Sequence, residues 1–200
     1  MWEQFKYDID IQKVNDVELD IGDYKGLDKD EYPSYPGKEH YKLLGYLSQT
    51  VSDSVIIEIG THHGMSALAL SKNKTNTIHT FDIIDKVDPK LKEIENIKFH
   101  IENVFEEPVM EKWQETILNS SMIFIDIAQH EGIMEYEFYC FLRDKNYQGL
   151  LIADDIWHFK GMRDHFWCHI PSYQKCDVTK YGHWSGTGII KVFGQKIPMH

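Results

Sequence analysis

Cysteine, basic charge and long apolar runs are all scarce in this chain of 200 residues. Its three cysteines, Cys140, Cys168 and Cys176, lack the spacing of metal ligands, so we expect a reducing compartment rather than a disulfide framework. Lysine and arginine total 21 against 32 acids, and the net charge of −11 argues against nucleic acid or an anionic membrane as the main partner. No apolar run approaches membrane-spanning length and no leader peptide opens the chain, which predicts a cytoplasmic protein.

The overall composition and length are those of one globular domain with a sizeable core, since 42% of the 200 residues are hydrophobic. Residues 1–37 have mixed charge and no sustained period, which predicts an arm or cap over the main domain at 38–200. Apolar runs then alternate with helical stripes, and the order predicts an α/β fold: a doubly wound, mostly parallel seven-stranded sheet with an antiparallel last strand. The predicted strands lie at residues 55–59, 76–82, 97–103, 121–126, 148–153, 177–180 and 187–193.

One stretch, residues 55–70, organises the rest of the chain. It reads Val-Ile-Ile-Glu-Ile-Gly-Thr-His-His-Gly-Met-Ser-Ala-Leu-Ala-Leu, a buried strand that ends at Gly60 and a helix that begins near Ser66. Glycine lets a ligand approach the backbone, and the first turn of the helix offers unpaired N–H groups. The stretch therefore predicts a site for a polar or anionic ligand, in which Glu58 accepts a hydrogen bond from an ammonium or hydroxyl group.

The glycine spacing fits neither a dinucleotide fingerprint nor a phosphate-binding loop. The pattern Glu58-x-Gly60-x-x-x-Gly64-x-Ser66 resembles motif I of class I S-adenosylmethionine-dependent methyltransferases, in the branch of catechol O-methyltransferase and macrolide sugar O-methyltransferases. His62 stands where many of these enzymes carry a third glycine, and an ordinary βα turn of another α/β protein is the alternative. The resemblance implies a Rossmann-like methyltransferase fold. It also implies that S-adenosylmethionine contacts Glu58, Gly60, Thr61, Gly64 and Ser66.

Two more polar residues close predicted strands. Asp82 lies about twenty residues beyond the glycine turn, the distance that places an acid beside a ribose, and the resemblance gives it both ribose hydroxyls. A helix cap or a loop acid is the alternative for Asp82. The family commonly ends its third strand in Gly-Asp, where this chain has Glu102-Asn103. The resemblance therefore makes Asn103 a contact of the adenine, with a plain turn asparagine as the alternative.

Acids also close the fourth and fifth predicted strands, at Asp126, Asp154 and Asp155. We expect them to converge, because ligands of an open parallel sheet gather at the carboxyl ends of its strands. Three oxygen ligands suit Mg²⁺ or a similar divalent cation, which keeps coordination positions for water and two substrate oxygens. Residues 122–126 and 149–155 also resemble the two metal-bearing segments of catechol O-methyltransferase. The alternative is that Asp154 and Asp155 cap the following helix.

The resemblance implies attack of a hydroxyl group on the sulfonium methyl, with Mg²⁺ lowering the pKa of that hydroxyl. The catechol enzyme has a lysine base three residues after its first metal aspartate, and Gln129, which cannot accept a proton, stands there in this chain. We rank His130 first and His158 second as the catalytic base. A surface or structural role is the alternative for each histidine.

The sequence thus predicts a Mg²⁺-dependent O-methyltransferase that acts on a hydroxyl of a small molecule, with a sugar, glycan or other vicinal diol as the first choice of acceptor. Two other functions stay open. One is a methyltransferase that works without a metal, and the other is a non-catalytic α/β binding module with a degenerate cofactor pocket. A homodimer is common among such domains.

Overall fold

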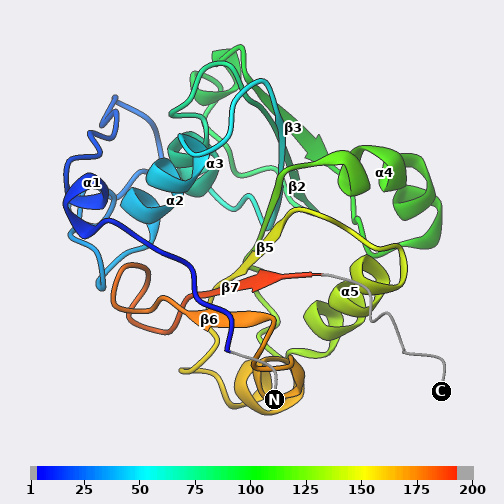
Figure 1. Ribbon diagram of the computed structural model, residues 1–200. Coiled ribbons are helices and arrows are strands. Elements are labelled where there is room, and N and C mark those ends of the chain that lie inside the picture. The colour runs from blue at the N-terminus through cyan, green and yellow to red at the C-terminus, as the bar shows by residue number, and fades with distance from the viewer. Residues whose placement is uncertain (1–3, 193–200) are drawn as a thin grey trace, which may run out of the picture.

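The computed structural model describes residues 4–192, which form a seven-stranded sheet with helices on both faces (Figure 1). The sheet order is β3-β2-β1-β4-β5-β7-β6, and β7 runs antiparallel to both of its neighbours whereas the other pairings are parallel. This confirms the doubly wound, mostly parallel sheet with an antiparallel last strand. The strands are β1 (Val55–Ile59), β2 (Thr77–Asp82), β3 (Ile97–Ile101), β4 (Met122–Ile125), β5 (Leu150–Ala153), β6 (Lys175–Asp177) and β7 (Gly188–Lys191).

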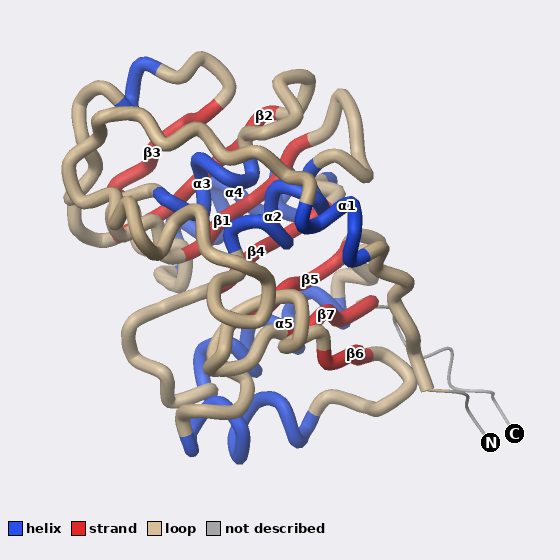
Figure 2. Tube along the Cα trace, turned by 90° about the vertical axis from the view of Figure 1, so that its left-hand side faces the viewer, coloured by secondary structure: helices blue, strands red, loops and turns tan. Residues whose placement is uncertain are grey.

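Within residues 4–192, five α-helices and three short irregular helices connect or cover the strands. The row of strands runs across the molecule from β3 to β6 (Figure 2). The α-helices are α1 (Ile11–Asn15), α2 (Tyr41–Ser48), α3 (Met65–Leu70), α4 (Glu107–Asn119) and α5 (Ile133–Asp144). The short ones are the 3-10 turns η1 (Leu91–Glu93) and η3 (Trp167–His169) and the π-helical turn η2 (Met162–Phe166).

The expected bounds differ from the observed ones at the end of the chain. The strand predicted at 177–180 is β6, which ends at Asp177 instead, because the Asp177 carboxylate accepts a hydrogen bond from the backbone N–H of Thr179 at 2.9 Å and turns the chain. The strand predicted at 187–193 is β7, and Phe193 lies outside the described residues.

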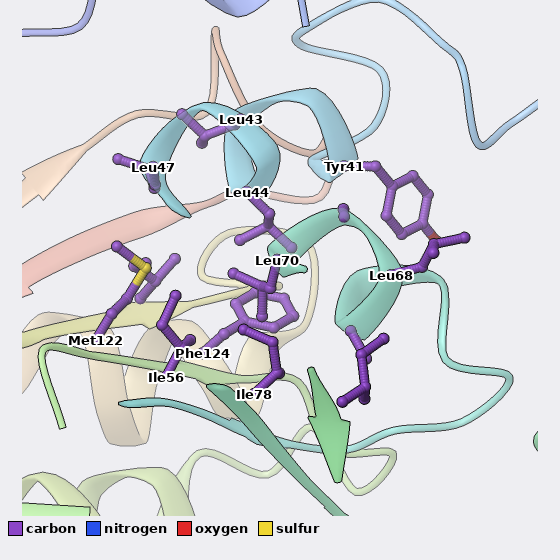
Figure 3. Packing of buried hydrophobic residues seen from close by; sticks show 14 of the residues in the cluster. Tyr41, Leu43, Leu44, Leu47, Ile56, Leu68, Leu70, Ile78, Met122 and Phe124 are labelled. Carbon is purple, nitrogen blue, oxygen red and sulfur yellow. The ribbon is translucent and has the colours of Figure 1, made fainter. Parts of the chain in front are cut away.

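Alternate residues of the central strands enter two separate apolar clusters, as a sheet buried on both faces requires. On β4, Met122 and Phe124 pack on the side of α2 and α3, whereas Ile123 and Ile125 pack on the side of α4 and α5. Figure 3 shows the first cluster, in which leucines of α2 and α3 lie against side chains of β1, β2 and β4. The sheet is thereby fixed between helices, and the carboxyl ends of its parallel strands are left for the loops.

The segment predicted as an arm, described from residue 4, packs into the first of these clusters. Its Val14 and Tyr32 are fully buried, and the Tyr32 ring lies 5.1 Å from the ring of Tyr41 on α2. Tyr35, by contrast, is 69% exposed. Among residues 4–192, none of the helices combines the length and the apolar composition that a bilayer crossing requires.

Candidate functional site

A cavity of about 380 Å³ opens at the carboxyl ends of β1 to β4. The chain order reverses between β1 and β4, and this switch point is where open α/β sheets bind their ligands. The cavity volume lies within the range of about 300 to 1,000 Å³ that small-molecule sites occupy. Its walls come from the loops that follow the four strands, at residues 60–66, 82–86, 102–105 and 126–130, together with His40 and Tyr41 at the start of α2.

The glycine turn after β1 forms one wall. Gly60 has a positive φ of 102°, and a Cβ atom there would lie 1.7 Å from the backbone oxygen of Asp126, so only glycine lets the β1 and β4 loops pass each other. Gly64 also has a positive φ, 84°, and directly precedes α3. The cavity wall includes Gly60, Thr61 and Ser66 but not Gly64.

Asp82 and Asn103 line the cavity from β2 and β3, and both also fix loops. The Asp82 carboxylate accepts hydrogen bonds from the backbone N–H of His62 at 2.7 Å and of Ile84 at 3.0 Å. The His62 bond ties the end of β2 to the glycine turn. Asn103 accepts from the backbone N–H of Phe105 at 3.2 Å, so this residue is at once a turn asparagine and part of the wall.

Glu58 is fully buried and is not part of the cavity wall. The Thr80 hydroxyl donates to Glu58, and the Thr61 hydroxyl lies 2.5 Å from that of Thr80, so a chain of polar groups joins Glu58 to the wall. Burial raises the pKa of Glu58 to about 7, although Ser66 and Thr80 oppose the shift.

Asp126 and His130 line the cavity and form a group with Asp155, with one ligand atom of each within 4.8 Å of the others. His130 Nδ1 lies 3.0 Å from Asp155 Oδ2, and the imidazole stacks on the ring of Phe159 at 4.0 Å. Burial and the charge of Asp154 raise the pKa of Asp126 to about 7. A cation bound here would relieve this repulsion, and the two carboxylates offer the oxygen ligands that Mg²⁺ prefers.

Asp154 belongs to a second group, with His40 and His183. Its Oδ2 atom lies 2.8 Å from His183 Nδ1 and 3.4 Å from His40 Nδ1. Burial acts to raise the pKa of Asp154, but the two histidines hold it well below its ordinary value. Burial likewise opposes the shift of His40, whose pKa the Asp154 charge raises to about 9. The three acids predicted as metal ligands thus reach the same edge of the sheet but divide between two groups.

Sequence reasoning missed His40 and His183. His40 directly precedes α2 and His183 lies in the loop before β7. Neither histidine belongs to a sequence motif. The only local feature of the sequence near either of them is the group of glycines around His183, in Tyr-Gly-His-Trp-Ser-Gly-Thr-Gly at 181–188, which indicates a loop.

His158, the second candidate base, is an exposed residue outside the cavity wall, with its ring 4.6 Å from that of Trp184. Gln129 is part of the wall.

The sequence matches no model of a protein family and no curated protein, but solved structures match the fold. A putative caffeoyl-CoA O-methyltransferase from Staphylococcus aureus covers 76% of this chain and 82% of its own, with 18% identity and a TM-score of 0.51. The MycE methyltransferase of the mycinamycin biosynthetic pathway, in complex with Mg, SAH and mycinamycin VI, covers 74% of this chain and 46% of its own, with 13% identity and a TM-score of 0.51. These similarities show a shared fold. As regards the fold, they confirm the resemblance inferred from residues 55–70.

Proposed function

We propose that this chain is an S-adenosylmethionine-dependent O-methyltransferase that uses a divalent cation to methylate a hydroxyl group of a small molecule. One observation carries the proposal. A single cavity at the switch point is lined by the glycine turn and Asp82 and also by Asp126 and His130. This lining offers groups for two reactants in one cavity, a cofactor at the glycine turn and Asp82 and an acceptor at Asp126 and His130.

The cofactor end offers groups of the right kind for S-adenosylmethionine. Asp82 has its carboxylate in the wall and can accept from ribose hydroxyls, and Asn103 lies where the adenine would reach the end of β3. Gly60, Thr61 and Ser66 form the wall nearest to α3, and Glu58 stands behind them through the hydroxyls of Thr61 and Thr80. When bound, the cofactor supplies an activated methyl group on a positively charged sulfur.

On the acceptor side, Asp126 and Asp155 would hold the divalent cation. Asp154, the third acid predicted as a metal ligand, belongs to the neighbouring group with His40 and His183. When bound, Mg²⁺ lowers the pKa of the acceptor hydroxyl. The acceptor oxygen would receive the methyl group that the bound cofactor supplies, and the part left to this chain would be to take up the hydroxyl proton with a base. His130 is in reach of this chemistry, because it lines the cavity and Asp155 orients its ring.

A sugar or other vicinal diol remains our proposed acceptor, because two neighbouring oxygens can chelate one cation. The shared fold with MycE, which was solved with Mg, SAH and mycinamycin VI, supports this choice. Trp184, next to His183 in the chain and 57% exposed, offers an aromatic surface near the acids. The homodimer and the cytoplasmic location stay predictions.

Thermal unfolding of the full chain with S-adenosylhomocysteine tests the cofactor end. A ligand at about 100 times its Kd stabilises the folded state by about 2.7 kcal/mol, so the melting temperature of the wild type should rise. Asp82→Ala removes an acceptor from the wall and should abolish most of the rise. Asp85→Ala is the matched control, because Asp85 follows on the same loop but pairs with Lys92 and does not line the cavity. An unchanged melting temperature of the wild type would contradict cofactor binding.

Methyl transfer to a vicinal-diol sugar in the presence of Mg²⁺ tests the acceptor end. We expect transfer to stop when a chelator removes the cation, because the hydroxyl pKa then returns to its ordinary high value. Activity that survives the chelator would favour a metal-independent methyltransferase.

A further inference from the structure

Two histidines that the proposed reaction does not use lie beside the cavity with Asp154. His40 directly precedes α2, Asp154 follows β5, and His183 belongs to the loop before β7, so three distant segments converge. One ring nitrogen of each histidine and one carboxylate oxygen of Asp154 lie within 4.8 Å of one another. His40 and Asp154 are only 4% and 2% exposed, so their polar atoms depend on partners within the protein.

The Nδ1 atom of His40 makes no hydrogen bond to any described residue, although it lies 3.4 Å from Asp154 Oδ2. A buried polar atom without a partner costs free energy. Two ligand atoms that are each about 2.1 Å from a tetrahedral metal ion are about 3.4 Å apart. The separation of His40 Nδ1 and Asp154 Oδ2 is therefore that of two ligands of one ion, and an ion there would give the nitrogen its partner.

His183 completes the group. Its Nδ1 atom lies 2.8 Å from Asp154 Oδ2 and 2.6 Å from the Ser185 hydroxyl, which are hydrogen-bond distances, so an ion bound here would replace these hydrogen bonds and move the ring outward to a separation of about 3.4 Å from Asp154 Oδ2. The other ring nitrogen, Nε2, faces the carboxylate of Glu39 at 3.7 Å. A metal-bound histidine almost always directs its second ring nitrogen at a carboxylate, a carbonyl or water, which fixes the orientation of the ring. Thr187 donates a hydrogen bond to Asp154 Oδ1 at 3.1 Å, so Oδ2 is the oxygen that remains for the histidines.

We propose that His40, Asp154 and His183 form a binding site for Zn²⁺ or a chemically similar transition-metal ion. Two imidazole nitrogens and a carboxylate oxygen suit Zn²⁺, whereas Mg²⁺ prefers oxygen ligands and keeps several waters. Three protein ligands leave a fourth tetrahedral position for water or another ligand. The site goes beyond the proposed methyl transfer: Asp154 serves this ion, and the neighbouring group keeps Asp126 and Asp155 for Mg²⁺.

Calorimetric titration of the full chain, stripped of metal by a chelator, with Zn²⁺ alone tests the proposal. The wild type should bind Zn²⁺ at a single site that excess Mg²⁺ does not block. His183→Ala removes a ligand and should weaken Zn²⁺ binding by about 100-fold or more, whereas Glu39→Gln, which only loosens the ring of His183, should weaken it by about 10-fold. His169→Ala removes an exposed histidine outside the site and should bind as the wild type does.

Three outcomes overturn the proposal. They are an absence of Zn²⁺ binding by the wild type, undiminished binding by His183→Ala, and loss of binding in His130→Ala, which would put the ion among the rim acids. Thermal unfolding of each metal-free variant checks that it folds, and Glu39→Gln carries the test should His183→Ala unfold. S-adenosylhomocysteine binding by the same metal-free samples separates the two proposals, because its survival without Zn²⁺ binding contradicts only the metal site.

Discussion

At the scale of single residues, the neighbours Asp154 and Asp155 direct their carboxylates toward different nearest histidines. Asp155 has a positive φ of 62°, a conformation that residues other than glycine rarely adopt. The Asp154 carboxylate lies 2.8 Å from His183 and 3.4 Å from His40, whereas Asp155 lies 3.0 Å from His130 and 3.9 Å from His183. Two acids that are adjacent in the chain therefore have different nearest histidines.

Of the described glycines, Gly60 leaves the least space for a Cβ atom. We expect Gly60→Ala to cost more than about 4 kcal/mol of unfolding free energy, because its Cβ would overlap the backbone oxygen of Asp126 at 1.7 Å. Gly37→Ala is the matched control, with a similar φ of 93° but with its nearest atom 3.2 Å from the new Cβ. It should cost about 1 to 2 kcal/mol, mainly the cost of the backbone conformation, because the Lys180 backbone oxygen at 3.2 Å needs to move only slightly. Urea unfolding measures both, and equal costs would contradict the close approach of the two loops.

At the scale of elements, β2 and β3 are joined by a pair of histidines. His79 Nδ1 lies 3.0 Å from His100 Nε2, and their rings are stacked 5.1 Å apart beside Trp113 of α4. Burial lowers the pKa of both, and that of His100 falls from 6.5 to about 4. The folded state therefore holds this pair uncharged under conditions in which the unfolded chain begins to take up protons.

The lowered pKa of His100 determines how the unfolding free energy changes with pH. Since the folded-state pKa of His100 is depressed, its contribution to stability is fully present above pH 6.5 and is lost as the pH falls from 6.5 through about 4. His100→Gln should reduce the decline of the unfolding free energy across this window, and His169→Gln, at an exposed histidine, should leave the decline unchanged. Urea unfolding at a series of pH values is the measurement. The same decline in all three proteins would rule out the β2–β3 pair as its source.

At the scale of the whole molecule, the segment from residue 4 to residue 37 contributes side chains to the core of the main domain. Tyr32 is fully buried against Tyr41, so Tyr32→Ala should cost about 3 to 5 kcal/mol of unfolding free energy. Tyr35→Ala, at a tyrosine of the same segment that is 69% exposed, should change stability by less than about 0.5 kcal/mol. Denaturant unfolding compares the two. Similar small effects would mean that the segment can leave the domain without disturbing its core.

The sequence by itself determined the sheet and the position of the cavity. Apolar periodicity and the glycine spacing at 55–70 are local properties, and they sufficed to predict the parallel strands, the glycine turn and the acids at the strand ends. Only the tertiary structure decided which side chains meet those acids. His40 and His183 are separated from Asp154 by 114 and 29 residues, counted along the printed numbering, and no local pattern encodes such contacts. Packing of α2 and of the loop before β7 against the sheet brings them together, and so assigns Asp154 and Asp155 to different groups.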